Sequence, residues 1–404
     1  IYQTTAYVFD DADHAASLFN LQTFGYIYSR LTNPTVSALE EKVAALEDGR
    51  GAVACASGHA AQMLAMFVLM NPGDNFVASR NLYGGSITQF THTFKKFDWH
   101  VNFVDPADPE NFRNAIDDKT KAIFLEVLAN PGGIIVDLEP VAEIARDAGI
   151  PLIVDNTMAT PYLCRPFEWG ADISIHSMTK FLGGHGTSMG GVVVESGQFD
   201  WAQNDKFPSM TEPDPAYHGL TFYETFGDFG FSTKAKAVAL RDLGPTLAPQ
   251  NAFNILTGIE SLPVRMDRHL QNAQAVAEFL EGHPAVAWVS YAGLKSSPYH
   301  ALAKKYLPKG PGSVFTFGLK GGYEAGVRAV ESVELLSHLA NLGDTRSLII
   351  HPASTTHRQL TEEQQIASGA GPDVVRVSIG LETVEDIIAD LDQALSYAQQ
   401  KASD

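Results

Sequence analysis

Cysteine and long apolar runs are scarce in this sequence. Its 404 residues include two cysteines, Cys55 and Cys164, and neither belongs to a Cys-x-x-Cys pair. A disulfide framework is therefore not expected, and this cysteine usage favours the reducing cytoplasm. The apolar run Met63–Met70 is far shorter than the roughly 20 residues of a membrane-spanning helix, and the first residues lack the basic and apolar regions of a signal peptide. We therefore expect a cytoplasmic protein without a membrane partner.

Positive charge and several common ligand motifs are also lacking. The chain has 28 Lys and Arg residues against 47 Asp and Glu residues, a formal net charge of -19. This balance argues against nucleic acid as a partner, because a phosphate backbone needs a basic surface. Neither G-x-G-x-x-G nor G-x-x-x-x-G-K-[ST] occurs, which disfavours a nicotinamide-dependent dehydrogenase and an NTPase. His176, His185 and Asp155 have no H-x-x-x-H or H-E-x-x-H spacing, so we expect no metal.

What the sequence does contain, over residues 51–245, is an alternation of short apolar runs with helical patterns. This alternation predicts an α/β domain with a mostly parallel central sheet. Ligands of such folds gather at the carboxyl ends of the strands. The runs expected to form strands are AVACAS, NFVAS, HVNFVD, KAIFLEV, PLIVDNT, ADISIHS and GVVVE.

Two further regions flank this domain. Residues 1–50 are predicted to form an extended arm to about residue 33 and then a helix from Pro34, whose face would carry Val36, Leu39, Val43 and Leu46. Residues 246–404 are predicted to form a smaller α+β domain. The aromatic-rich stretch 199–231 has no clean periodicity and is expected to be a long ordered loop. The elements expected in 246–404 are a helix near Arg268–Leu280, strands near Val286–Tyr291, Ser313–Leu319 and Val374–Ile379, and a final helix with Ile387, Ile388, Leu391 and Leu395.

Polar residues stand at four of the predicted strand ends. Gly58 and His59 open a helix directly after a strand, so their backbone amides could hold a phosphate. Glu126 and Asn130 follow another strand, and Asp155 and Thr157 a third. Each is also compatible with an ordinary turn or a helix cap.

Lys180 follows the fourth strand, between the hydroxyls of Ser177 and Thr179 and a glycine-rich turn. A solvated turn lysine is one interpretation. The other is a site for pyridoxal phosphate (PLP), which needs a lysine for a Schiff base, a carboxylate for the ring nitrogen and donors for the phosphate. Asp155 is the candidate carboxylate, and Asn130 could donate to the phenolic oxygen. Taken together, the residues favour PLP.

Six motifs, in order, extend this hypothesis over nearly the whole chain. The lysine motif S-x-T-K-x-x-x-G-H spans Ser177–His185. With these motifs the chain resembles the Cys/Met-metabolism family of PLP-dependent enzymes, which implies the aspartate-aminotransferase-like fold type I. The other five are YSRLTNPT (28–35), SGHAA (57–61), LYGG (82–85), VDNT (154–157) and VRVSIGLE (375–382).

The resemblance implies a role for each matching residue. Lys180 would bind the cofactor and move the substrate's Cα and Cβ protons, Asp155 would pair with the pyridine nitrogen, and Tyr83 would stack on the ring and assist proton transfer. Arg376, helped by Ser347, would bind the substrate α-carboxylate. The other residues implied to bind the cofactor are Asn130, Thr157, Ser177, Thr179, the amides of Gly58 and His59, and Tyr28 and Arg30 from a neighbouring subunit. A homo-oligomer follows, and family habit favours a tetramer of two dimers.

Within the family, the stretches GADISIHSMTKFLGGHGTS and DPAYHGLTF resemble those of O-acetylhomoserine sulfhydrylases. This resemblance implies γ-replacement on O-acetylhomoserine by sulfide or methanethiol. Methionine γ-lyase and cystathionine γ-synthase are the alternatives within the family. Such lyases typically carry Cys where this chain has Gly85, which disfavours the first. A non-catalytic binding module is a further alternative, disfavoured by the intact set of Lys, Asp, Tyr and Arg residues.

Overall fold

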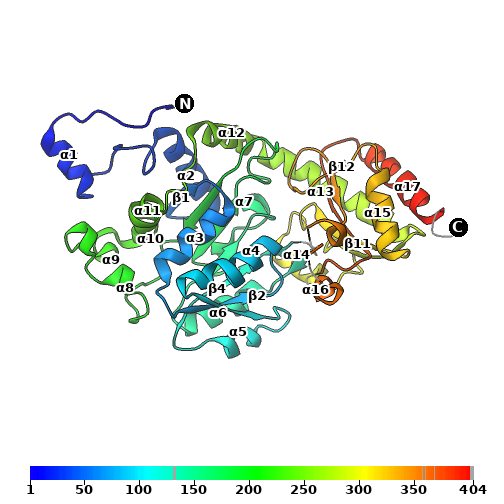
Figure 1. The fold of residues 1–404 in the computed structure, drawn as a ribbon, viewed down its shortest axis with the longest axis horizontal. Helices are drawn as coiled ribbons and strands as arrows, with labels where there is room; N and C mark the ends of the chain where they lie inside the picture. The colour runs from blue at the N-terminus through cyan, green and yellow to red at the C-terminus, as the bar shows by residue number, and fades with distance from the viewer. Residues whose placement is uncertain (131–132, 357, 360, 368, 401–404) are drawn as a thin grey trace.

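A seven-stranded sheet forms the centre of the larger part of the molecule (Figure 1). The structure is a computed structural model and describes residues 1–130, 133–356, 358–359, 361–367 and 369–400. The strand order is β1-β9-β8-β7-β4-β2-β3, in which β9 runs antiparallel to both neighbours and the other pairs are parallel. The mostly parallel sheet predicted from the sequence is therefore confirmed. The strands are β1 (Gly51–Cys55), β2 (Asn75–Ser79), β3 (His100–Val104), β4 (Thr120–Glu126), β7 (Leu152–Asp155), β8 (Ile173–Ser177) and β9 (Gly191–Glu195).

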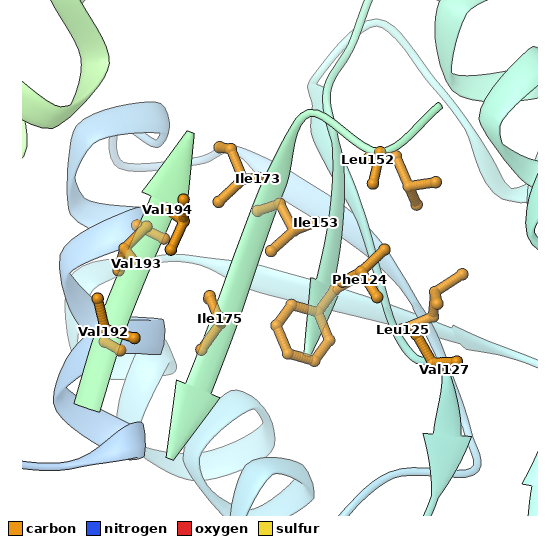
Figure 2. Close-up of a cluster of buried hydrophobic side chains, with 14 of the residues drawn as sticks. Phe124, Leu125, Val127, Leu152, Ile153, Ile173, Ile175, Val192, Val193 and Val194 are labelled. Atoms are coloured by element: carbon orange, nitrogen blue, oxygen red, sulfur yellow. The ribbon is translucent and has the colours of Figure 1, made fainter. Parts of the chain in front are cut away.

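The central strands are buried on both faces, which explains their nearly continuous apolar sequences. All seven residues of β4 and all five of β9 are buried. Figure 2 shows side chains of β4, β7, β8 and β9, such as Phe124, Ile153, Ile175 and Val193, packed into one cluster. The parallel register places the ends of β4, β7 and β8 side by side, with Glu126 opposite Asp155.

The helix that the sequence predicts from Pro34 begins at that residue. In α2 (Pro34–Glu47), Pro34 occupies the first turn and the Asn33 side chain caps the Thr35 amide. One expectation for this helix is wrong, because Leu46 is exposed whereas Leu39 and Val43 are fully buried. The other helices of this part are α3 (Gly58–Leu69), α4 (Gly84–Thr88), α5 (Glu110–Ala115), α6 (Leu138–Asp147), α7 (Thr160–Leu163), α10 (Gly230–Lys234) and α11 (Arg241–Leu243), and a small hairpin joins β5 (Leu128–Ala129) to β6 (Ile134–Ile135).

Two segments predicted to lack helices contain short ones. The N-terminal arm includes α1 (Ala12–Phe19), whose first turn is capped by the Asp11 side chain, so a fully extended arm was a wrong prediction. Asp11 is a local capping signal that a search for apolar periodicity overlooks. Within 199–231, α8 (Pro208–Thr211) and α9 (Phe222–Phe226) interrupt the expected loop. Aromatic stacking orders this segment, with Trp201 and Phe231 rings 5.4 Å apart.

The smaller C-terminal part is built on a five-stranded sheet, of which three strands were predicted, and lies at the opposite end of the molecule from the N-terminal arm (Figure 1). Its order is β10-β11-β14-β13-β12. Helix α13 (Leu262–Gly282) is longer than predicted, and α12 (Pro249–Glu260), α14, α15, α16, β12 and β13 were not predicted. The remaining elements are β10 (Val286–Ser290), α14 (His300–Tyr306), β11 (Val314–Leu319), α15 (Gly322–Ser332), β12 (Ser337–His338), β13 (Leu348–Ile350), α16 (Glu362–Ala367), β14 (Val374–Ser378) and α17 (Val384–Gln400).

The fold class predicted from the sequence is thus present in both of its parts. The domain boundaries placed at residues 50 and 245 stay predictions. None of the helices in the described part of the chain is long and apolar enough to cross a membrane.

Candidate active site

A cavity of about 270 Å³ lies at the carboxyl ends of β4, β7 and β8 and is closed on one side by residues of the C-terminal part. It brings together most of the residues singled out in the sequence. Those that line it are Gly58, His59, Tyr83, Glu126, Asn130, Asp155, Thr157, Ser177, Thr179, Lys180 and Arg376.

Three predicted residues lie outside this lining. Tyr28 and Arg30 are in the N-terminal arm, where the Arg30 guanidinium donates to the carbonyl oxygen of Arg241 at 3.0 Å. Their predicted role requires a second subunit, and in the single chain they do not reach the cavity. The Ser347 hydroxyl is fully buried and donates to Glu382 at 2.8 Å while accepting from the Gly380 amide at 2.9 Å. Ser347 therefore supports the backbone near Arg376 and presents no side-chain atom to the cavity.

Lys180 points its ammonium group into the cavity. Its Nζ donates to Asn341 Oδ1 at 2.6 Å. Burial, and then the positive charge of Arg376, lower the pKa of Lys180 from 10.5 to about 8. A larger fraction of neutral amine is therefore present near neutral pH than for an exposed lysine, which is the form that attacks an aldehyde or accepts a proton.

The turn after Lys180 is held by both parts of the molecule. Gly184 has a φ of +74°, a conformation that favours glycine, and a Cβ there would lie 2.2 Å from the Arg265 guanidinium. Arg265 in α13 donates to the Leu182 carbonyl at 3.4 Å. The Thr345 amide, from the C-terminal part, donates to the Gly184 carbonyl at 3.0 Å. The glycine-rich sequence thus permits a close approach of three segments beside the lysine.

Two carboxyl groups lie side by side at the cavity floor. Glu126 accepts from the backbone amides of Tyr83 at 2.7 Å and Asn130 at 3.0 Å, which fixes the loop after β4. Asp155 accepts from the Thr157 amide at 3.0 Å and from Gln62 Nε2 at 3.4 Å. Burial raises the pKa of both groups, and the charge of Asp155 adds to the shift of Glu126, whose pKa rises to about 8. A cation next to Asp155 would be stabilised there.

The N-terminus of α3 lies at one end of the cavity. Gly58 is its first residue, and the Ser57 side chain caps the Ala60 amide. A Cβ at Gly58 would lie only 2.8 Å from Ser177 Cβ, so the glycine lets the helix N-terminus approach the end of β8. The Ser177 amide donates to Thr157 Oγ1 at 2.8 Å, which gathers two hydroxyl side chains at the same place. Free amides at a helix N-terminus suit a phosphate.

Arg376, on β14, enters the cavity from the C-terminal sheet. Its Nη1 donates to Asn130 Oδ1 and its Nη2 to the Asn341 carbonyl, each at 3.2 Å. Among the described residues no carboxylate lies within salt-bridge distance of this guanidinium. Burial lowers the pKa of Arg376. A guanidinium held by neutral partners is suited to a bidentate carboxylate ligand.

Gln62 and Asn341 are cavity residues that the sequence analysis missed and that contact predicted site residues. Gln62 lies one helical turn after Gly58 on α3, and this spacing of four residues was a signal that could have found it. Asn341 is far from every motif in the sequence and reaches Lys180 only through the pairing of the C-terminal sheet. No local pattern predicts that contact.

A second buried cluster lies behind the strand that ends before Lys180. His176 pairs with Glu47 from α2, and both side chains are fully buried. Glu47 also accepts from Ser174 Oγ and Asn156 Nδ2, each at 3.0 Å. His176 therefore contacts a carboxylate. Within the described residues there is no group of three potential metal ligands.

Comparisons with known proteins agree with this geometry. Residues 1–396 match the family described as Cys/Met metabolism PLP-dependent enzyme. The chain belongs to this family. An O-acetyl-L-homoserine sulfhydrylase from Leptospira meyeri is 52% identical over 98% of this chain and 91% of its own length. A homocysteine synthase from Schizosaccharomyces pombe is 48% identical over 98% of this chain and 93% of its own.

A solved structure has the same fold as this chain. It is that of a putative O-acetylhomoserine (thiol)-lyase from Campylobacter jejuni, with a TM-score of 0.95 and 44% identity, covering 98% of this chain and 94% of that one. The crystallised protein carries a pyridoxyl-lysine phosphate. The family and PLP predictions are thereby confirmed.

The residues of this chain fit PLP on their own chemistry. A half-buried carboxyl group, Asp155, lines the cavity and could pair with a protonated pyridine. The glycine at position 58 leaves room beside a helix N-terminus for a phosphate. The Lys180 amine lies in the same cavity.

Proposed function

We propose that the protein catalyses γ-replacement on O-acetyl-L-homoserine with sulfide or methanethiol, giving L-homocysteine or methionine and acetate. The observation that carries the proposal is the joint placement of the Lys180 amine and the Arg376 guanidinium in one cavity. The substrate class comes from relatives of 44–52% identity whose names are O-acetylhomoserine sulfhydrylase or homocysteine synthase.

The amino-acid substrate is oriented by its α-carboxylate. Arg376 binds this group bidentately in place of part of its contacts to Asn130 and Asn341. Ser347 assists only indirectly, by holding Gly380 and Glu382 near the end of β14. The substrate's Cα then lies within reach of Lys180.

Bound PLP supplies the electron withdrawal that makes the Cα and Cβ protons acidic. The chain positions it through Asp155 at the ring nitrogen, Asn130 at the phenolic oxygen and Tyr83 against the ring. Lys180 removes and returns protons at Cα and Cβ, a task suited to a group whose pKa is lowered to about 8. The phosphate is held by Ser177, Thr179, Thr157 and the Gly58 and His59 amides.

We also propose that Tyr28 and Arg30 complete this phosphate site from a second subunit. Tyr28 is 43% exposed, and both residues lie just before α2, at the end of the N-terminal arm. A homo-oligomer, a tetramer of two dimers, in the cytoplasm fits this arrangement.

The decisive experiment incubates the purified PLP-loaded protein with O-acetyl-L-homoserine, with and without sulfide. Homocysteine and acetate formed together only when sulfide is present support the proposal. Rapid formation of 2-oxobutanoate and ammonia from methionine, with little homocysteine, would instead assign a γ-lyase. Cystathionine formed from cysteine in preference to homocysteine from sulfide would assign a cystathionine γ-synthase.

A further inference from the structure

One titratable side chain in the cavity has no part in the function proposed above. The described lining contains six such groups, and four of them, Glu126, Asp155, Lys180 and Arg376, are bound to neighbours or assigned to the cofactor and substrate. Tyr83 is assigned to the ring. The sixth is the imidazole of His59, for which the sequence provided only a backbone role.

The His59 ring is fixed in place yet accessible. Its residue belongs to the first turn of α3, and its carbonyl accepts from Gln89 Nε2 at 3.0 Å. The ring packs edge-on against Tyr83, with centroids 5.8 Å apart and planes at 60°. Neither ring nitrogen is hydrogen-bonded to a described residue, and the residue is exposed.

Gly85 makes this position of the ring possible. A Cβ at residue 85 would lie 2.4 Å from Tyr83 Cε1 and 2.9 Å from His59 Nε2. A side chain there would therefore displace one of the two rings. The absence of a side chain at 85 leaves the imidazole and the phenol together on one wall of the cavity.

The other groups of the lining indicate what His59 contacts. In the proposed function Arg376 holds the α-carboxylate, Lys180 reaches Cα and Tyr83 lies against the ring. His59 is the one titratable side chain of the described lining whose ring atoms have neither a hydrogen-bond partner nor an assigned role. It is therefore the group available to a sulfur nucleophile that enters this cavity.

We propose that His59 is a catalytic residue that binds the incoming sulfide or thiol and accepts its proton. A sulfur lone pair forms the S–Cγ bond while the π bond between Cβ and Cγ breaks, and Lys180 returns the proton that its electron pair takes up at Cβ. The S–H bond breaks, and that proton passes to the imidazole and then to solvent. Acetate has already departed with the electron pair of the C–O bond. Neutral imidazole is the side chain best matched to this transfer near neutral pH. The inference rests on the proposed γ-replacement.

The first test compares His59→Gln with wild type in the PLP-loaded enzyme. We expect kcat/KM for sulfide to fall by about 10²-fold, the magnitude typical of a lost acid–base group. KM for O-acetylhomoserine and the visible absorption band of the cofactor should stay unchanged. The matched control is His92→Gln, an exposed histidine just beyond α4, which should leave all three quantities unchanged.

A second readout does not depend on turnover. Diethylpyrocarbonate modifies exposed histidines, and peptide mapping by mass spectrometry resolves each site. L-methionine, which places a sulfur near Cγ, should protect His59 and leave His92 reactive. Sulfide kinetics of His59→Gln within twofold of wild type, or no protection of His59, overturns the inference. Wild-type enzyme that makes no homocysteine would instead contradict the proposed function, so the two failures are distinguishable.

Discussion

The two sheets contribute to the cavity in different ways. The central sheet supplies a nearly contiguous set, with Asp155 and Lys180 at the ends of adjacent strands. The C-terminal part supplies Arg376 from β14 and Asn341 from the loop between β12 and β13, both far along the chain from the central sheet. The first set suits the part of the chemistry that all family members share, the cofactor. The second set suits binding of the substrate's carboxylate. In addition to burial, Arg376 lowers the pKa of Lys180, and Asn341 accepts the hydrogen bond of its ammonium group.

Removing Lys180 should have the largest effect, because it removes the attachment point of the cofactor and the proton carrier together. We expect Lys180→Ala to lower kcat by at least about 10³-fold. The visible absorption of a cofactor linked to the protein should also be lost. Borohydride reduction followed by peptide mapping checks the attachment directly. Turnover that persists in this variant would refute the assignment of Lys180.

Removing Arg376 tests whether the C-terminal sheet acts on substrate and not on cofactor. Arg376→Ala should raise KM for O-acetylhomoserine by about 10²-fold, because charge-assisted hydrogen bonds are worth about 1.5–3 kcal/mol each. PLP binding, measured by fluorescence titration, should change little. Arg376→Lys keeps the charge but loses the bidentate geometry, so it should restore only part of the affinity. If Arg376→Ala and Arg376→Lys both lost PLP affinity to the same extent, Arg376 would also contribute to cofactor binding. The proposed division of roles between the two sheets would then be wrong.

The effect of Arg376 on the pKa of Lys180 should be visible in the pH dependence of PLP incorporation. Because burial and Arg376 lower the pKa of Lys180 to about 8, the neutral amine predominates above that pH. The rate at which the PLP-free protein incorporates PLP should therefore rise with pH and level off above about pH 8. In Arg376→Ala the positive charge is gone, and the midpoint should move to higher pH. A midpoint that stays in place would mean that burial alone sets the lysine's pKa.

The smallest expected effect concerns the phosphate end. Gly58→Ala places a Cβ 2.8 Å from Ser177 Cβ and should push α3 away from β8. We expect PLP affinity to fall by about tenfold, equivalent to one weakened hydrogen bond, with KM for O-acetylhomoserine unchanged at saturating PLP. Gly282→Ala, where a Cβ meets no atom within 4 Å, is the control. A rise in KM from Gly58→Ala would show that this end also positions substrate.

The same contrast explains what the sequence could predict. The carboxyl ends of neighbouring parallel strands lie at the same edge of a sheet. Apolar periodicity and the lysine motif were therefore enough to predict that Asp155 and Lys180 lie close together. The N-terminal helix α1 and the short helices after residue 207 depend on caps and aromatic packing, which apolar periodicity does not report. Leu46 follows the helical period of Val43 but falls beyond the edge of the buried face.

Contacts between the two parts of the molecule could not be predicted from apolar periodicity or motifs. The bond between Lys180 and Asn341 joins residues 161 positions apart, and only the pairing of the C-terminal strands brings them together. His59 was assigned a backbone role because its motif marks a helix start. Its ring position depends on the missing side chain at Gly85, which is a property of three-dimensional packing.

The turn after Lys180 also limits how the molecule can move. Its Gly184 carbonyl accepts from the Thr345 amide, and Leu381, just past β14, donates to the Thr345 carbonyl at 2.8 Å. Any rotation of the C-terminal sheet away from the lysine would break this chain of backbone hydrogen bonds. We therefore expect the Thr345 amide to exchange its hydrogen as slowly as those of the central strands. Substrate would then enter by rearrangement of exposed side chains, with both sheets behaving as one rigid body during turnover.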